Sequence, residues 1–345
     1  MRVLVFGCGA VGSLLGAGLV DAGADVALLD RGEQFSALST QGLRLISPAG
    51  DMQHVTRFKA VTDPREFGPA DLVVLAVKAH QIRPSLDLLE RAFGQETALL
   101  TVQNGIPWWY FQRHPGGHAE RVLRSVDGDG QLAGRIDPAR VIACVAYPAA
   151  EVIEPGLVRH VEGHRFPIGE LDGERSARCQ AIAALLERGG FKVPVISDMR
   201  SEIWLKAWGN LAFNPVSALT GMTMAEICRE PATRALVVRM MTEAAEIASR
   251  LGVPMRVPLE KRLSGAERVG HHKTSMLQDL HAGRPLEIDA ILGVVLELGG
   301  IVDAPVETLR TVHELAMAID PGRRSPGSVD SHTSGQRTVQ DATET

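Results

Sequence analysis

The chain has 345 residues, of which 45% are hydrophobic and 22% are charged, an ordinary composition for a globular protein large enough to form two domains. Its formal net charge of −5, without any dense block of Lys and Arg, argues against nucleic acid or an anionic membrane surface as the main partner. The four cysteines are scattered and form no CxxC pair, which argues against a structural zinc site or a disulfide framework.

Two apolar stretches need to be distinguished from export or membrane signals. Residues 1–24 contain a basic second residue and an apolar run, as signal peptides do, but their glycine spacing favours a nucleotide-binding turn. The best other candidate, residues 288–302, is interrupted by Asp289 and Glu297 and does not reach the roughly 18 apolar residues that span a bilayer. We therefore predict a cytoplasmic protein that has no membrane partner.

Residues 2–102 alternate between predicted strands and helices. Short apolar runs predict buried strands, and segments with an apolar period of 3.6 residues predict helices. The strands are expected at 2–6, 25–29, 71–77 and 98–102, the helices at 10–22, 33–41 and 81–93, and a mixture of strands and turns at 43–61. This alternation predicts a mostly parallel, doubly wound sheet with helices on both faces.

The rest of the chain changes character twice. Residues 141–171 are rich in predicted strands, which we assign to the far side of the same sheet, and a helix at 175–189 and a strand at 193–196 follow. Beyond them the pattern is helical, with helices expected at 199–213, 223–229, 231–251, 257–265 and 284–300. The sequence thus predicts an α/β Rossmann domain at 1–196 and an all-helical domain at 197–320. The polar tail, 321–345, has too few apolar residues to fold and is predicted to be disordered.

A glycine-rich motif, Gly7-Cys8-Gly9-Ala10-Val11-Gly12, connects the first predicted strand to the first predicted helix. In such a motif the first glycine permits a tight turn, the second lets a pyrophosphate approach the backbone, and the third lets the helix pack closely on the strand. The helix N-terminus then offers N–H groups and partial positive charge to the phosphates. Because a second strand ending at Asp30 follows, the motif predicts a dinucleotide site and not merely a glycine-rich turn.

The two residues after the second strand bear on which dinucleotide binds. The Asp30 carboxylate could accept hydrogen bonds from a ribose 2′-hydroxyl, which favours NAD. The Arg31 guanidinium could pair with a 2′-phosphate, which favours NADP. From these two residues alone both cofactors stay open, and Arg31 could equally be a solvated loop charge.

The segment from Ser201 to Pro215, SEIWLKAWGNLAFNP, sets polar residues among apolar ones. Lys206, Asn210 and Asn214 are four residues apart and therefore lie along one face of a helix. A lysine on such a face, if the face lines a cleft, can donate a proton to a carbonyl oxygen while a hydride reaches the carbon. An ordinary solvated stripe would explain the same spacing. We expect the helix to end or bend before Pro215.

A second polar region lies between residues 271 and 289. It contains Ser275 and, in front of an apolar helix, Glu287 and Asp289. The neighbouring His271 and His272 have no third ligand at a usual spacing, which favours solvated or buried histidines over a metal site.

Five motifs in this order resemble those of ketopantoate reductases (2-dehydropantoate 2-reductases). They are GCGAVG, DLVVLAVKAHQ with Lys78, QNGI with Asn104, IWLKAWGNLAFNP, and SMLQD followed by EID, and the resemblance extends from Met1 to about Asp320. Members of that family are two-domain enzymes that use NADPH to reduce 2-dehydropantoate to pantoate, a step towards pantothenate. The resemblance therefore implies an NADP-dependent oxidoreductase whose partner is a small 2-oxo acid.

The resemblance also implies roles for individual residues. Lys206 would be the general acid on the carbonyl oxygen of the substrate, and Glu287 would be the second catalytic residue. The substrate would be bound by Asn104, Asn210, Asn214 and Ser275. The cofactor would be held by Gly7, Gly9, Ala10, Val11, Gly12, Arg31, Lys78 and Asn104.

Two features depart from the family pattern. The family often has a further substrate-binding Asn after the Asn-Pro pair, whereas residues 216–227 here contain none, which puts the exact substrate in doubt. Asp30 is the second departure, because its carboxylate would repel a 2′-phosphate unless Arg31 outweighs it. The aromatic run from Trp108 and Trp109 to Phe111 is explained equally well by a larger pocket and by core packing.

Three interpretations stay open. The first is a ketopantoate reductase, the second a reductase of the same fold acting on another 2-oxo acid or ketone, and the third a non-enzymatic sensor that binds a dinucleotide. Lys206 and Glu287 favour an enzyme, because a sensor needs the glycine loop but no proton donor. A helical second domain could bury a homodimer face, although nothing in the sequence specifies one.

Overall fold

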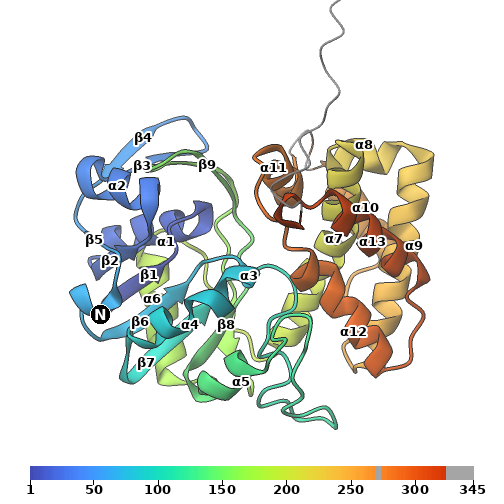
Figure 1. Ribbon diagram of the computed structural model, residues 1–345, viewed down its shortest axis with the longest axis horizontal. Coiled ribbons are helices and arrows are strands. Elements are labelled where there is room, and N and C mark those ends of the chain that lie inside the picture. Colours follow the sequence, from blue (N-terminus) through green and yellow to red (C-terminus); the bar gives the residue numbers. More distant parts are fainter. Residues whose placement is uncertain (269, 271–272, 324–345) are drawn as a thin grey trace, which may run out of the picture.

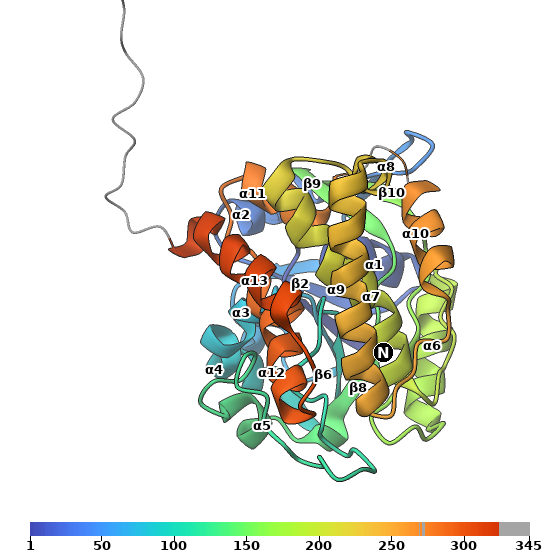
Figure 2. The same ribbon diagram turned by 90° about the vertical axis from the view of Figure 1, so that its right-hand side faces the viewer.

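The computed structural model describes residues 1–268, 270 and 273–323. Figure 1 shows a region built on β-sheet and a helical region that lie side by side. In Figure 2, which is seen from the helical side, α7 (Met199–Thr220) and α9 (Pro231–Arg250) lie in front of the sheet. Buried apolar residues from both regions, among them Leu4 and Leu211, belong to one continuous core. The two regions are therefore packed against each other and not merely tethered.

Seven strands form the main sheet, in the order β11-β8-β7-β6-β1-β2-β5. All neighbours are parallel except β11, which is antiparallel to β8. β1 lies between β2 and β6, so the strand order reverses beside it, and open α/β sheets bind ligands at such a point. The predicted doubly wound sheet is confirmed. The strands are β1 Arg2–Phe6, β2 Asp25–Leu29, β5 Lys59–Val61, β6 Ala70–Leu75, β7 Phe93–Thr101, β8 Val141–Cys144 and β11 Ile168–Glu170.

The apolar run of β1 is continuous because both faces of the sheet are covered. Val3 and Val5 belong to the core beneath α1 (Ala10–Asp21) and α6 (Ala177–Arg188). Leu4 and Phe6, which point to the other face, belong to the core shared with the helical region. A strand buried on both faces has no polar alternation, which explains why its sequence is simply apolar.

A second sheet of four strands stands apart from the first, in the order β4-β3-β10-β9. The strands are β3 Leu43–Ile46, β4 Met52–Val55, β9 Ala149–Glu154 and β10 Leu157–Glu162. The assignment of residues 141–171 to the far side of the main sheet is therefore only half right: β8 and β11 belong there, but β10 pairs in parallel with β3. Strand pairing across more than a hundred residues has no local signature in the sequence.

Two predicted elements around the main sheet are wrong in extent. The single helix expected at 81–93 is divided into α3 (Ala79–Ile82), a 3₁₀ turn with Pro84, and α4 (Leu86–Glu90), while β7 already begins at Phe93. Proline cannot donate the helical hydrogen bond, which accounts for the break. The strand expected at 193–196 contributes only one isolated bridge, between Val195 and Ile168, and α2 spans Gly32–Gln41.

The helical region contains α7 to α13. α8 spans Met224–Arg229, α10 Leu259–Arg268, α11 Ser275–His281, α12 Val294–Ile301 and α13 Glu307–Ile319. α11 and α13 were not predicted. The helix expected at 284–300 begins late, with the π-helical turn η4 (Asp289–Gly293) leading into α12. Among the described residues no helix combines the length and the apolar character required to cross a membrane.

α7 does not end before Pro215 as expected but continues through it to Thr220 and stops at Gly221, whose φ is +74°. A proline inside a helix costs about 3 kcal/mol, because one backbone hydrogen bond is lost. Phe213 and Val216 are 2% and 1% exposed, and burying such side chains stabilises by roughly 2 kcal/mol each. Core packing around the proline thus offsets its cost, and the helix stays continuous.

The aromatic run at residues 108–111 is part of the core, and the predicted tail is described only in its first residues. Trp108, Trp109, Tyr110 and Phe111 are all buried, and Trp204 donates through its indole N–H to the hydroxyl of Tyr110 at 2.8 Å. Packing between the two regions is therefore the better explanation of this run. Residues 321–323, placed in the tail by the prediction, form a 3₁₀ turn, and residues 324–345 lie outside the described residues.

Candidate functional site

The glycine loop between β1 and α1 has the geometry that its sequence predicts. Gly7 has a φ of +100°, which favours glycine, and makes the turn off β1. A Cβ on Gly12 would lie 2.0 Å from the carbonyl oxygen of Gly7, so the helix can approach the loop only with glycine there. A Cβ on Gly9 would meet nothing within 4 Å, and Gly9 is exposed at the start of α1. The loop thus offers an open path beside a helix N-terminus, which fits a dinucleotide pyrophosphate.

Asp30 faces the glycine loop. Its Oδ2 accepts a hydrogen bond from the backbone N–H of Cys8 at 2.7 Å, and its Oδ1 accepts from the backbone N–H of Arg31 at 2.8 Å. Both carboxylate oxygens therefore already hold the loop in place. The Arg31 side chain is exposed and has no hydrogen bond or ion pair with the part of the chain that the structure describes.

Lys206 projects from α7 towards the ends of β7 and β8. Its ammonium nitrogen donates to Asn104 Oδ1 at 2.6 Å and to the backbone carbonyl of Ala146. Burial lowers the pKa of Lys206 to about 8, although Cys144 and Glu287 act in the opposite direction. A lysine held by two acceptors keeps its third N–H for another partner. The site thus contains an oriented lysine that is ready to give up a proton near neutral pH.

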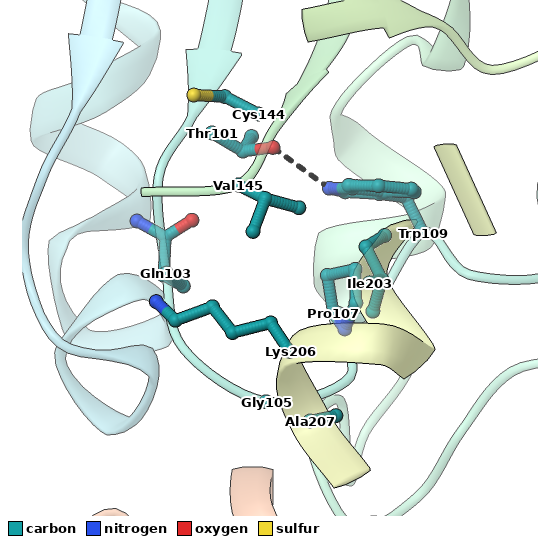
Figure 3. Close-up of a pocket in the computed structure, with 10 residues that line it drawn as sticks. All are labelled: Thr101, Gln103, Gly105, Pro107, Trp109, Cys144, Val145, Ile203, Lys206 and Ala207. Atoms are coloured by element: carbon teal, nitrogen blue, oxygen red, sulfur yellow. Dashed lines mark hydrogen bonds between the residues drawn. The ribbon is translucent and has the colours of Figure 1, made fainter. Parts of the chain in front are cut away.

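A small cavity of about 10 Å³ lies beside the Lys206 stem, as Figure 3 shows, and is large enough for roughly one water. Gln103 lines it, and its amide nitrogen donates to the carbonyl of Leu75 at 2.6 Å, which ties the loop after β7 to the end of β6. The cavity is too small for an organic acid. A substrate therefore cannot be bound inside this cavity as it stands.

Two further contacts join the sheet region to the helical region, through Glu287 and through Lys78. Glu287 Oε1 accepts a hydrogen bond from the backbone N–H of Ala79 at 3.0 Å. Lys78, at the N-terminus of α3, forms an ion pair with Asp279 of α11, and Asp279 also accepts from Arg284 Nε at 3.0 Å. The Asp279 side chain is 9% exposed and that of Lys78 29% exposed, so this pair is largely shielded from water.

Replacing Asp279 with asparagine is expected to lower the free energy of unfolding by about 2 kcal/mol, because Lys78 then keeps a shielded charge without its partner. Urea unfolding monitored by circular dichroism measures this change. Asp87→Asn is the control, since Asp87 pairs with Arg135 at 2.7 Å but its side chain is 81% exposed. Equal shifts in the two variants would contradict a special role for the Lys78–Asp279 pair.

The remaining predicted site residues are less closely connected. Asn210 is half-buried and Asn214 is buried, one and two turns along α7 from Lys206. Ser275 is exposed at the first position of α11. No hydrogen bond among the described residues joins the side chains of these three to Lys206. The structure thus brings together Lys206, Asn104 and Glu287 but does not join the side chains of the other three to this cluster.

Sequence reasoning missed three parts of this arrangement. The carbonyl of Ala146 carries no residue-type signal, since every residue has one. Asp279 stands in the quoted SMLQD motif, but nothing there indicates its pairing with Lys78. His80, two residues after Lys78, lies near Glu287, and burial lowers its pKa. Among residues 1–268, 270 and 273–323 there is no group of three or more metal-binding side chains, and His271 and His272 lie outside the described residues.

Comparisons with known proteins identify the family to which the chain belongs. Residues 3–173 match the family described as ketopantoate reductase PanE/ApbA, and residues 198–320 match its C-terminal family. A 2-dehydropantoate 2-reductase from Mesorhizobium japonicum is 46% identical over 93% of this chain and 99% of its own length. A crystal structure from Ralstonia solanacearum has a TM-score of 0.88 and 36% identity, covering 93% of this chain and 98% of that one. The crystal structure of 2-dehydropantoate 2-reductase from Geobacter metallireducens has a TM-score of 0.81 and 26% identity, covering 92% and 99%. The chain therefore belongs to the ketopantoate reductase family of pyridine-nucleotide-dependent oxidoreductases.

Proposed function

We propose that this protein reduces the ketone of 2-dehydropantoate to the alcohol of pantoate with NADPH. The observation that carries the proposal is the placement of Lys206, whose ammonium is held by Asn104 and Ala146 at the carboxyl ends of the strands. The glycine loop lies at the same edge of the sheet, at the end of β1, with β6 between β1 and β7. The 46% identical relative from Mesorhizobium japonicum, which bears the name of this activity, supports the choice of substrate.

In the proposed reaction Lys206 is the general acid. The bound nicotinamide cofactor would supply a hydride to the ketone carbon. As negative charge develops on the ketone oxygen, the third N–H of Lys206 donates its proton to that oxygen. Asn104 and Ala146 fix the other two N–H groups, so the lysine loses little freedom on reaching this geometry. Glu287 lies close enough to raise the pKa of Lys206 and so favours the protonated donor.

The same proposal assigns the remaining polar groups to binding. The amides of Asn210 and Asn214 would hydrogen-bond the substrate's carboxylate and hydroxyl, with Ser275 approaching from α11. Glu287 would accept from a substrate hydroxyl through the carboxylate oxygen that Ala79 does not use. Lys78 and Asn104 would lie beside the cofactor. Hydrogen bonds to the substrate would compensate these amides for the water that burial removes from them.

NADPH is proposed over NADH because of the different positions of Asp30 and Arg31. Both Asp30 oxygens already accept backbone N–H groups, which leaves the carboxylate fewer lone pairs for a ribose hydroxyl. The exposed Arg31 is free to pair with a 2′-phosphate. The backbone N–H groups on Asp30 also reduce the repulsion that its charge would exert on the phosphate.

The test is an assay of NADPH consumption by the purified protein with 2-dehydropantoate, alongside a panel of other 2-oxo acids and with NADH in place of NADPH. We expect 2-dehydropantoate with NADPH to give the highest kcat/KM. If another 2-oxo acid gave a higher kcat/KM, that acid would be assigned as the substrate in place of 2-dehydropantoate. Absence of turnover with every acid would overturn the proposal.

The pH dependence follows from Lys206. Because the lysine must be protonated to act as an acid and its pKa is about 8, kcat/KM for reduction is expected to be level below pH 8 and to fall tenfold per pH unit above it. For pantoate oxidation the neutral lysine is needed, so kcat/KM should instead rise up to pH 8. Initial rates in both directions between about pH 6 and pH 10 measure this. If kcat/KM fell above pH 8 for both reduction and oxidation, or rose for both, Lys206 would be excluded as the titrating group.

A second candidate is the reduction of a different 2-oxo acid or ketone. Residues 216–227 contain no Asn, and this segment turns from the end of α7 into α8 with Met222 and Met224 packed against the core. A thioether cannot hydrogen-bond a substrate hydroxyl as an amide does, so a less polar substrate would be better accommodated. The panel of 2-oxo acids distinguishes the two candidates.

A further inference from the structure

Gly105, next to Asn104, makes an unusually close contact with the helical region. A Cβ at Gly105 would lie 1.9 Å from the carbonyl oxygen and 2.6 Å from the carbonyl carbon of Ala290, and Gly105 has a φ of +81°. The following residue, Ile106, donates its backbone N–H to the same Ala290 oxygen at 3.0 Å. The loop after β7 is therefore docked backbone to backbone on the helical region, with no room for a side chain.

The acceptor of this contact lies within the π-helical turn η4. The wider turn is evident in the hydrogen bond from the N–H of Val294 to the carbonyl of Asp289, five residues earlier. A π-helical turn displaces carbonyl groups from the regular α-helical ladder and is frequently found at functional sites. Here the Ala290 carbonyl accepts a hydrogen bond from outside the helix.

The segment that carries this carbonyl also carries Glu287. Glu287 holds the N–H of Ala79 through its side chain, and Ala290 holds the N–H of Ile106 through its backbone. These two contacts join one short segment of the helical region to the loops that follow β6 and β7. Asn104, whose side chain accepts the hydrogen bond from Lys206, lies directly before Gly105.

We propose that Gly105 and the carbonyl of Ala290 are a positioning contact that sets the Asn104–Lys206 hydrogen bond. When the helical region is docked, the loop is held in one position and Asn104 orients the ammonium of Lys206. Neither Gly105 nor Ala290 touches the reacting atoms, and both act through Asn104. The inference rests on the proposed function, in which Lys206 is the proton donor.

The test is Gly105→Ala, studied as the full chain. The added methyl group must displace the loop from Ala290, and displacements of about 1 Å in a catalytic group can cost 10²-fold in rate, so we expect kcat to fall about tenfold. The dissociation constant for NADPH, measured by its fluorescence, is expected to change less than about twofold, because Gly105→Ala leaves the glycine loop between β1 and α1 and the Arg31 side chain unchanged.

Gly50→Ala is the matched control. Gly50 has a φ of +92°, so alanine is strained there as well, but it lies in the turn between β3 and β4 and its Cβ would meet nothing within 4 Å. We expect Gly50→Ala to lose stability in urea as Gly105→Ala does while keeping its kcat. A kcat for Gly105→Ala equal to that of Gly50→Ala would overturn the proposal.

Amide hydrogen exchange in the unmodified protein tests the contact even if Gly105→Ala does not fold. The N–H of Ile106 is expected to exchange far more slowly than an unstructured amide, because it is bonded to Ala290. Exchange at the unstructured rate would overturn the docking. If the unmodified protein reduces no 2-oxo acid, the proposed function fails, whereas slow exchange at Ile106 would still support the contact.

Discussion

Lys206→Met is expected to lower kcat for ketoacid reduction by about a thousandfold, the effect of removing a well-placed general acid. Methionine keeps the length and the apolar stem of the side chain but has no proton to donate. Asn104 and Ala146 lose their shared donor, but Asn104 itself, the glycine loop and Arg31 are all retained, so the dissociation constant for NADPH should stay within about twofold. Single-turnover rates with excess enzyme separate this chemical step from product release.

The pH profile gives Lys206→Met a second readout. If Lys206 is the titrating group, the fall in kcat/KM above pH 8 should disappear from the residual activity of the variant. Lys261→Met is the control, because Lys261 is an exposed lysine on α10 and should leave both rate and profile unchanged. A kcat for Lys206→Met within about threefold of the unmodified protein would remove Lys206 from the chemistry.

The parts of the fold that could be predicted are those whose neighbours in space are also neighbours in sequence. Local sequence patterns predict β1 from its apolar run, the turn from its glycines and α1 from its helical period. The order of strands and helices then predicts a doubly wound sheet. The pairing of β10 with β3 could not be predicted in this way, because the two strands are more than a hundred residues apart. α13 was missed although Leu309, Val312 and Ala316 follow a helical period and are buried, so its signal was present.

The sequence predicts which residues belong to the site but not how they are arranged in space. Lys206, Asn104 and Glu287 were identified by their motifs, and the structure places them in or beside one cluster. Their actual partners include the backbone groups of Ala146 and Ala79, which no residue type reveals. The π-helical turn η4 likewise arises from packing and has no sequence pattern of its own. Several of the contacts that connect the two regions around Lys206 therefore involve a backbone group on one side.

Arg31→Ala is expected to raise KM for NADPH about 100-fold while changing KM for NADH less than about twofold. The reason is the loss of charge-assisted hydrogen bonds to the 2′-phosphate, each worth roughly 1.5–3 kcal/mol, in a group that NADH lacks. The exposed Arg31 side chain has no partner within the described residues, so its removal should not disturb the fold. Initial rates with each cofactor at saturating ketoacid measure the ratio.

The hydrogen bonds of Asp30 provide a comparison for interpreting the change in cofactor binding in Arg31→Ala. Because the Asp30 carboxylate holds the backbone N–H groups of Cys8 and Arg31, Asp30→Asn should weaken the binding of both cofactors alike by loosening the loop. Arg31→Ala should by contrast discriminate between them. Equal losses with NADPH and NADH in Arg31→Ala would mean that Arg31 supports the loop and not the phosphate. The preference for NADPH would then have to come from other residues. In that case Arg31→Lys, which keeps the charge but not the bidentate geometry, would not recover any preference for NADPH over NADH relative to Arg31→Ala.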